Sequence, residues 1–191
     1  MDTTRASLLI RIRHASDTQA WSTFHDLYAP LLYRFARARG LSHEDAEEVR
    51  ATCYEAIVRQ IPHFEYDKSK GGFKAWLRTL VSRRVIDLLR KRREQIADTD
   101  QLLGLANAEL SVEELWEKQW RQQHLRFCMQ QARIHVSEAT YEAFIMLMEE
   151  GVSVPDVCER LGMTANQVYK AKARMLETLR ELMQSLQPDE S

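Results

Sequence analysis

The apolar positions of residues 72–93 recur at helical spacing and predict one long amphipathic helix. An apolar stripe at this period is typical of a helix that packs one face on a core. The stripe consists of Trp76, Leu77, Leu80, Val81, Val85, Leu88 and Leu89. The other faces are cationic and include Arg78, Arg83, Arg84, Arg90, Lys91, Arg92 and Arg93. Asp87 is the one acid of the stretch.

This predicted helix suggests contact with nucleic acid. Cationic side chains bind a phosphate backbone through counterion release, and aromatic rings offer faces on which unpaired bases stack. Aromatic residues stand at and before the start of the helix: Phe64, Tyr66, Phe73 and Trp76. The alternative is a solvated charged face on a core helix. For Trp76, its place on the apolar stripe favours core packing over base contact, and a loop aromatic such as Phe64 can simply cover the edge of a core.

The residues before this stretch also have helical periodicity. Residues 16–19 form a capping box, in which the hydroxyl of Ser16 and the side chain of Gln19 satisfy each other's exposed amides. Pro30 is expected to kink or restart the helix that follows, and Gly40 is expected to stop it. Ser42 caps the next helix, which ends at Pro62. No segment alternates at period two, so the predicted fold class is all-α.

After residue 94 the periodicity weakens and the charge becomes acidic. Residues 95–119 are predicted to be a linker, with a short helix towards Trp116. A second helical set follows, with Leu125, Phe127, Cys128 and Ile134 as its first apolar positions. The expected architecture is therefore two small helical domains, residues 1–94 and residues 120–191, joined by an acidic linker.

The C-terminal domain has the pattern of a helix-turn-helix. Ser153 caps a short helix that Gly162 ends, and Thr164 caps a longer second helix. The second helix of such a motif enters the major groove of DNA. The residues expected to face DNA are Thr164, Asn166, Gln167, Tyr169, Lys170, Lys172 and Arg174. Asn and Gln can bind adenine edges, whereas Lys and Arg bind phosphate or guanine. The alternative is an ordinary helical hairpin, but three cations and no acid between Met163 and Arg174 favour DNA.

Overall composition changes this picture little, but the distribution of charge does. The 191 residues include 27 Lys and Arg against 28 Asp and Glu, so net charge implies no nucleic-acid partner. Residues 95–117 nevertheless contain only acidic charges, directly after the most basic run of the chain. The acids are Asp98, Asp100, Glu109, Glu113, Glu114 and Glu117. Such asymmetry predicts separate surfaces with separate partners.

Cysteine and histidine spacing argues against a metal site or catalysis. Cys53, Cys128 and Cys158 are far apart and form no CxxC pair, so reduced and mostly buried thiols are expected. The six histidines are scattered without a nucleophile or ligand partner, so we assign no catalytic residue, metal or cofactor. No stretch approaches the roughly 20 apolar residues that span a bilayer. The N-terminal apolar run is too short and too interrupted by arginine for a signal peptide. A cytoplasmic protein without membrane insertion is expected.

The motifs together resemble a family. DAEEV, then FKAWLRTLVSRRVIDLLRKRR, an acidic linker and GVSVPDVCERLGMTANQVYKAKARMLETLRE follow one another in that order. This order and spacing resembles the extracytoplasmic-function (ECF) group of bacterial RNA polymerase sigma factors, which keep only the second and fourth conserved regions. The resemblance covers nearly the whole chain. It implies a protein that binds core RNA polymerase and directs promoter recognition and opening, without chemistry of its own.

The resemblance assigns roles to residues of this chain. The helix containing Asp45, Glu47, Glu48 and Val49 would dock on the large subunit of the polymerase. The segment that recognises and melts the downstream promoter element is matched by Phe73, Trp76, Leu77, Ile86, Asp87 and Leu89. Together with the charge and aromatic pattern described above, this gives the residues expected to contact the element: Phe64, Tyr66, Phe73, Trp76, Arg78, Arg83, Arg84, Arg90, Arg92 and Arg93. The helix with Tyr169, Lys170 and Arg174 would bind the upstream element. The linker would lie against basic walls of polymerase channels. An anti-sigma protein would be a further partner.

The chain departs from the family pattern at two places, which involve three residues. Ala51 and Thr52 stand where the family usually has Gln and Glu, which leaves the detail of polymerase docking open. Arg83 stands where the family commonly has Asn, near the pocket for a flipped base, which leaves the identity of that base open. Two other functions remain as alternatives: a regulator that binds duplex DNA by its helix-turn-helix without joining polymerase, and a helical adaptor whose basic faces meet acidic proteins.

Overall fold

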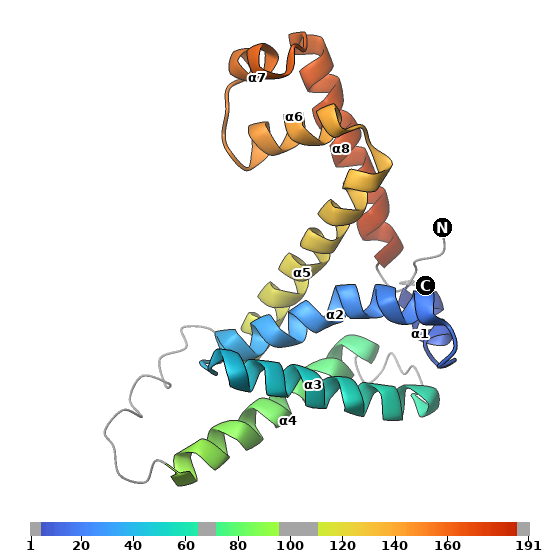
Figure 1. The fold of residues 1–191 in the computed structure, drawn as a ribbon, viewed down its shortest axis with the longest axis vertical. Helices are drawn as coiled ribbons and strands as arrows, with labels where there is room; N and C mark the ends of the chain where they lie inside the picture. The colour runs from blue at the N-terminus through green and yellow to red at the C-terminus, as the bar shows by residue number, and fades with distance from the viewer. Residues whose placement is uncertain (1–4, 65–71, 96–110, 187–191) are drawn as a thin grey trace. The chain divides into compact units, whose positions relative to one another are not determined.

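The computed structural model describes residues 5–64, 72–95 and 111–186, and it excludes the side chains of residues 5, 6 and 93–95. These described ranges form helices and contain no strand, so the predicted all-α fold class is confirmed (Figure 1). The elements are α1 (Arg5–Arg11), α2 (Thr18–Ala38), α3 (His43–Gln60), the 3₁₀ turn η1 (Ile61–His63), α4 (Gly72–Gln95), α5 (Val112–His135), α6 (Glu138–Met148), α7 (Val154–Leu161) and α8 (Ala165–Leu186).

The chain divides into two compact units. The N-terminal unit is Leu8–Gln123, and the C-terminal unit is His124–Ser191 together with Met1–Ser7. The division falls inside α5, which contributes its first half to one unit and its second half to the other. α5 begins at Val112, inside the stretch predicted to be a linker, and residues 96–110 of that stretch lie outside the described residues.

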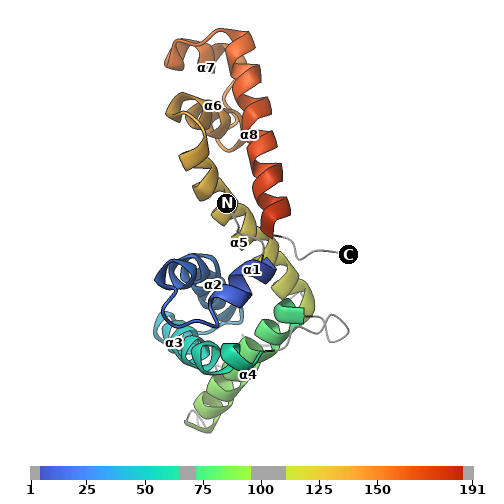
Figure 2. The ribbon, with the colours of Figure 1, turned by 90° about the vertical axis from the view of Figure 1, so that its right-hand side faces the viewer.

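Three helices make the core of the N-terminal unit. α3 lies beside both α2 and α4 (Figures 1 and 2). The fully buried side chains that these helices contribute are Phe24, Leu27, Tyr28, Leu31, Leu32, Phe35, Val49, Cys53, Ile57, Leu77 and Val81. Burying a large apolar side chain contributes about 1.5–3 kcal/mol, so this cluster supplies the main driving force for folding of the unit. The basic helix α4 is therefore anchored along one face.

Local signals placed most helix starts correctly. Ser42 caps α3 by accepting a hydrogen bond from the amide of Asp45, as predicted. The prediction for α2 was wrong by one residue, because Asp17 rather than Ser16 accepts from the amide of Ala20. Arg11 holds that carboxylate with two N–H donors, and this hydrogen bonding lowers the pKa of Asp17. α2 continues through Pro30 as one helix, so the chain does not restart there.

The C-terminal unit contains the predicted pair of helices joined at a glycine. α6 and α7 both pack on α8 (Figure 2). The core of this unit contains the buried cluster Ala143, Val157, Val168 and Ala171. Partly buried apolar side chains pack against the cluster: Met146, Leu147, Val152, Val154, Cys158, Leu161 and Met163. Two predicted apolar positions of α5 are not part of a core, since Leu125 is 49% and Ile134 is 75% exposed.

Candidate nucleic-acid interface

α4 presents a cationic face opposite its buried stripe. Leu77, Val81 and Val85 are buried, as the periodicity predicted. Arg83 and Arg84 are exposed, and Ile86, directly after buried Val85, is 56% exposed. The exposed cations of the later turns also include Arg90 and Lys91. The helix therefore offers guanidinium and ammonium groups to solvent while its backbone is fixed by the core.

The aromatic residues near the start of α4 form one cluster. Phe64 lies 5.1 Å from the ring of Trp76 and 5.9 Å from that of Phe73, centroid to centroid. Phe73 is only 3% exposed and contacts Phe24 and Tyr28, so its ring belongs to the core. Phe64 and Trp76 are half-buried, which leaves part of each ring accessible. Tyr66, the fourth predicted aromatic, lies outside the described residues.

Two cations of α4 are paired with the first turns of α5. The ammonium of Lys74 lies 2.6 Å from a carboxylate oxygen of Glu117, and Arg78 lies 3.8 Å from that of Glu113. Lys74 also lies 5.5 Å from the ring centroid of Trp120, a cation–π distance. Arg78 was predicted to contact DNA, and in this structure it faces an acid of its own chain.

A third cation of α4 joins the start of α3. Arg92 lies 2.5 Å from a carboxylate oxygen of Asp45 and donates to the hydroxyl of Ser42 at 3.2 Å. Sequence reasoning assigned Arg92 to DNA and Asp45 to polymerase, whereas the fold brings the two side chains together. Asp45 is 8% exposed and Val49 is fully buried, so both face inward. Glu47 and Glu48 remain on the outer side of α3, and Glu47 pairs with Arg50.

The turn between α7 and α8 has the geometry that the sequence predicted. Gly162 has φ of 62°, a left-handed conformation that suits glycine, and its amide bonds the carbonyl of Cys158. Thr164 and Gln167 form a reciprocal cap at the start of α8: the amide of Thr164 donates to the side chain of Gln167, and the amide of Gln167 donates to the hydroxyl of Thr164. The side chain of Gln167 is therefore engaged at the helix start.

The remaining predicted residues of α8 lie mostly on its outer face. Asn166, Tyr169 and Lys170 are exposed, and Lys172 is half-buried. Arg174 is exposed and lies 3.3 Å from Glu177 on the same helix, an (i, i+3) pair of a kind worth only a few tenths of a kcal/mol, roughly 0.2–0.5. A nucleic acid could displace such a weak pair. Buried Val168 and Met175 hold the opposite face of α8 on the core.

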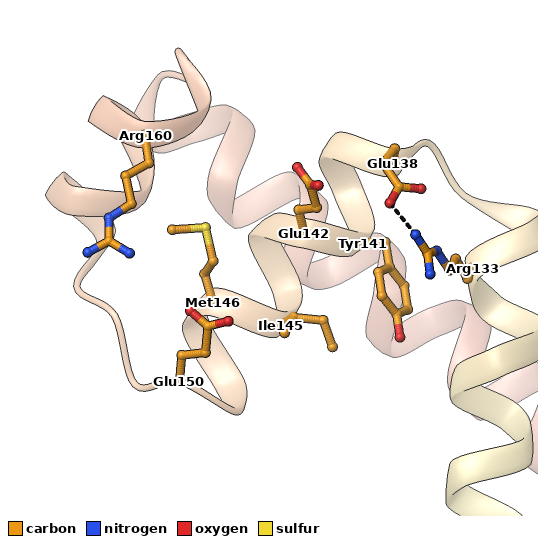
Figure 3. A pocket seen from close by; sticks show the side chains of 8 residues that line it. All are labelled: Arg133, Glu138, Tyr141, Glu142, Ile145, Met146, Glu150 and Arg160. Atoms are coloured by element: carbon orange, nitrogen blue, oxygen red, sulfur yellow. Dashed lines mark hydrogen bonds and ion pairs between the residues drawn. The ribbon is translucent and has the colours of Figure 1, made fainter.

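A groove of about 470 Å³ lies elsewhere in the C-terminal unit (Figure 3). Its lining is mixed in charge and consists of Arg133, Glu138, Tyr141, Glu142, Ile145, Met146, Glu150 and Arg160. Arg133 donates to Glu138 at 2.7 Å, and this hydrogen bond raises the pKa of Arg133. Three carboxylates in the lining make the groove unsuitable for phosphate, so we exclude it from the nucleic-acid surface.

The three cysteines all lie within the described residues, and they form no disulfide. Cys53 and Cys128 are buried and Cys158 is half-buried. Burial raises the pKa of the Cys53 thiol to about 12, so this thiol is protonated and unreactive near neutral pH. Within residues 5–64, 72–95 and 111–186, no group of three or more His, Cys, Asp or Glu could hold a metal ion. In the same ranges no helix is long and apolar enough to cross a bilayer.

Sequence reasoning missed the role of the first half of α5. Trp116 is 1% exposed and packs edge-on against Phe35 at 5.2 Å, while Trp120 contacts Tyr28 at 5.7 Å. A signal was present: Ser111 and Glu114 form a capping box that starts α5, and their hydrogen bonds lower the pKa of Glu114. The predominance of acids in this stretch favoured a linker instead.

Comparison with known proteins found one family model. Residues 24–95 match the model of sigma-70 region 2. The matched range begins within α2 and ends at the last residue of α4, so it contains the three-helix core and the cationic face. It stops before α5, whose two tryptophans complete the N-terminal unit. The search of curated proteins found no match.

Proposed function

We propose that this chain is a sigma factor of the extracytoplasmic-function group, which binds core RNA polymerase and directs promoter recognition and opening, because its residues 24–95 match the model of sigma-70 region 2. The best support is that the residues matching region 2 include α4, a helix whose cations face solvent. A second DNA contact, through α7 and α8 as a helix-turn-helix, is supported by the tight turn at Gly162 and by the cap at the start of α8. Such a protein would work in the cytoplasm, where an anti-sigma protein could bind it.

Strand opening is proposed to use the solvent face of α4 and the accessible aromatics. Arg83 and Arg84 would bind the phosphates of a separated strand, and an unpaired base would stack on Trp76 or Phe64. One such stack contributes about 1–3 kcal/mol, which offsets the cost of unpairing a base. Phe73 would support the ring of Trp76 from the core, because the two centroids lie 5.5 Å apart.

Duplex binding is proposed to use the outer face of α8. Asn166 and Tyr169 would approach base edges, and Lys170 would bind phosphate. Gln167 would keep its hydrogen bonds to Thr164 at the start of α8, unless hydrogen bonds to DNA replaced them. Since net charge is −1, the polymerase would supply much of the grip on promoter DNA.

Polymerase docking is proposed to use the outer side of α3. Glu47 and Glu48 would contact the enzyme, whereas Asp45 and Val49 would set the position of the helix from within. Ala51 is exposed and Thr52 is half-buried, with the hydroxyl of Thr52 bonded to the carbonyl of Glu48. Both lie on the same helix as the two glutamates.

The decisive experiment is reconstitution of the full chain with core RNA polymerase. We expect co-purification with the enzyme and specific transcripts from a genomic fragment library, read by sequencing. A chain that binds duplex DNA but never the enzyme would instead be a helix-turn-helix regulator. A chain that binds neither DNA nor polymerase would overturn the proposal and leave a helical adaptor.

Charge reversal tests the strand-binding face. Arg83→Glu with Arg84→Glu should abolish promoter-directed transcription while leaving helical circular dichroism intact, because both side chains are exposed. Reversal of Arg92 would be a poor test, since it would place two carboxylates together at Asp45. Unchanged transcription from a cognate promoter would remove this face from the mechanism. The matched control is Arg121→Glu with Arg126→Glu, two exposed arginines of α5 that take part in none of the proposed contacts.

A further inference from the structure

Arg13, in the turn between α1 and α2, reaches the start of the proposed strand-binding surface. A terminal nitrogen of its guanidinium donates to the backbone carbonyl of Phe64 at 2.5 Å, across 51 positions of the sequence. Both residues belong to the N-terminal unit. Arg13 precedes residue 24, where the match to sigma-70 region 2 begins, so the family model does not include it.

The turn that carries Arg13 is fixed on both sides. Before it, the side chain of Ile12 is 1% exposed and is anchored in the core. After it, the carboxylate of Asp17 accepts two hydrogen bonds from Arg11 and caps α2. The side chain of Arg13 is exposed, but it starts from a backbone that the fold holds in place. Such preorganisation lowers the entropy cost of binding a ligand.

The guanidinium of Arg13 keeps donors for a ligand. A guanidinium has several N–H donors in a planar fork, and the bond to Phe64 involves one terminal nitrogen. Within residues 5–64, 72–95 and 111–186, no carboxylate forms an ion pair with Arg13. Arginine binds phosphate strongly through charge-assisted N–H donors. Arg13 can therefore hold the carbonyl of Phe64 and a phosphate at the same time.

The surface that Arg13 would extend follows one line of α4. Trp76, Arg83 and Arg90 are spaced seven residues apart, which is almost two full turns, so the three side chains project in nearly the same direction. Arg83 and Arg90 are exposed, and Trp76 is half-buried. At the start of the helix the ring of Phe64 lies 5.1 Å from that of Trp76. The carbonyl of Phe64 then joins this line of cations and rings to Arg13.

We propose that Arg13 is a further strand-binding residue, which binds the phosphate of the nucleotide whose base stacks on Phe64. The guanidinium is bonded to the main chain of the same residue whose ring would hold the base, so one nucleotide can span both groups. The inference rests on the proposed role of α4 in binding a separated strand. Its consequence is that the strand site extends beyond the residues that match region 2, to the turn before α2.

The test is binding of a short fluorescein-labelled single-stranded thymidine oligonucleotide to the full chain, measured by anisotropy across a salt series. Arg13→Ala should weaken binding by about fivefold at 0.1 M salt and lower the salt slope by about 0.7, the value for one phosphate contact on a single strand. Arg13→Lys keeps the charge and should recover most of the slope. If Arg13 only positioned Phe64, its loss would weaken binding equally at all salt concentrations. An unchanged slope for Arg13→Ala would therefore overturn the inference.

The matched control is Arg37→Ala in α2. Arg37 is also exposed, and its guanidinium also donates to a backbone carbonyl, that of Leu41 at 2.7 Å. Leu41 precedes α3 and Phe64 follows it, and the 18 residues of α3 separate the two contacts by about 27 Å. Arg37→Ala should bind as the wild type does. An equal loss of slope in both variants would overturn the inference, because net charge alone would then explain the change.

A double-mutant cycle tests whether Arg13 and the ring of Phe64 hold the same nucleotide. Phe64→Ala removes the ring but keeps the carbonyl that Arg13 bonds, and it should weaken binding by about fivefold or more. If one nucleotide bridges both groups, the double variant should weaken binding by less than the product of the single effects. Multiplicative effects would place Arg13 on a different nucleotide and overturn the assignment.

Failure of this inference is distinguishable from failure of the proposed function. If Arg83→Glu with Arg84→Glu leaves binding of the same oligonucleotide unchanged, the proposed role of α4 fails, and the site at Arg13 fails with it. If that pair weakens binding while Arg13→Ala leaves the slope unchanged, only the inference about Arg13 fails. Circular dichroism melting of every variant checks that it is folded.

Discussion

The two basic helices of this protein differ in what their charges do. On α4, the cations that pair with acids from other elements include Lys74, Arg78 and Arg92. On α8, the ion pair of Arg174 is with Glu177 of the same helix, and Lys170 stands exposed. These cations of α4 therefore hold neighbouring helices together and are only partly available to a ligand. The cations of α8 are mostly exposed and available to a partner. A basic run in sequence does not by itself distinguish these uses.

The largest expected effect concerns Trp116, whose burial fixes the acidic start of α5. Trp116→Ala should destabilise the N-terminal unit by about 3–5 kcal/mol, because a fully buried indole leaves a cavity beside Phe35. Chemical denaturation followed by circular dichroism measures the loss. The control is Ile134→Ala on the same helix, where 75% exposure predicts a change within about 0.5 kcal/mol. Equal stability of the two variants would show that the first half of α5 does not complete this core.

The next effect concerns the open face of α8. Lys170→Ala should weaken duplex binding by about eightfold at 0.1 M salt and reduce the salt slope by about 0.9, the value for one phosphate contact on B-DNA. Binding of a single-stranded oligonucleotide to the Lys170→Ala variant should not change. Arg180→Ala, an exposed residue later on α8, is the control. An unaltered slope for Lys170→Ala would remove this side chain from the phosphate contacts and weaken the contrast with α4.

The smallest effect concerns the ion pair between α4 and α3. Asp45→Asn or Arg92→Gln should each cost about 1 kcal/mol of stability, a modest value because the Arg92 side chain is 44% exposed. The double variant should cost less than the sum, with a coupling of about 0.5–1 kcal/mol measured by chemical denaturation. The exposed pair of Glu47 and Arg50 provides the control cycle, where coupling should stay below about 0.5 kcal/mol. Additive losses at Asp45 and Arg92 would mean that their contact does not stabilise the fold.

Sequence periodicity and capping chemistry predicted much of the fold. The stripe of α4, the cap of α3 at Ser42 and the glycine turn before α8 rest on contacts within a few residues, so local reasoning identified them. The predicted cap at Ser16 was wrong by one residue, because the carboxylate of Asp17 caps α2 instead and Arg11, six residues earlier, holds that carboxylate in place. α5 begins at Val112, earlier than the predicted second helical set, because the acids of residues 113–117 suggest a linker although they lie on a helix.

The sequence by itself determined that this chain is helical, that one face of α4 is apolar and the other cationic, and that α8 follows a tight glycine turn. These properties follow from the period of side chains along a helix and from hydrogen bonds over three or four residues. Only the tertiary structure decided which charges face solvent. Lys74 meets Glu117 across 43 positions and Arg92 meets Asp45 across 47, and such distant partners are selected by the packing of the core.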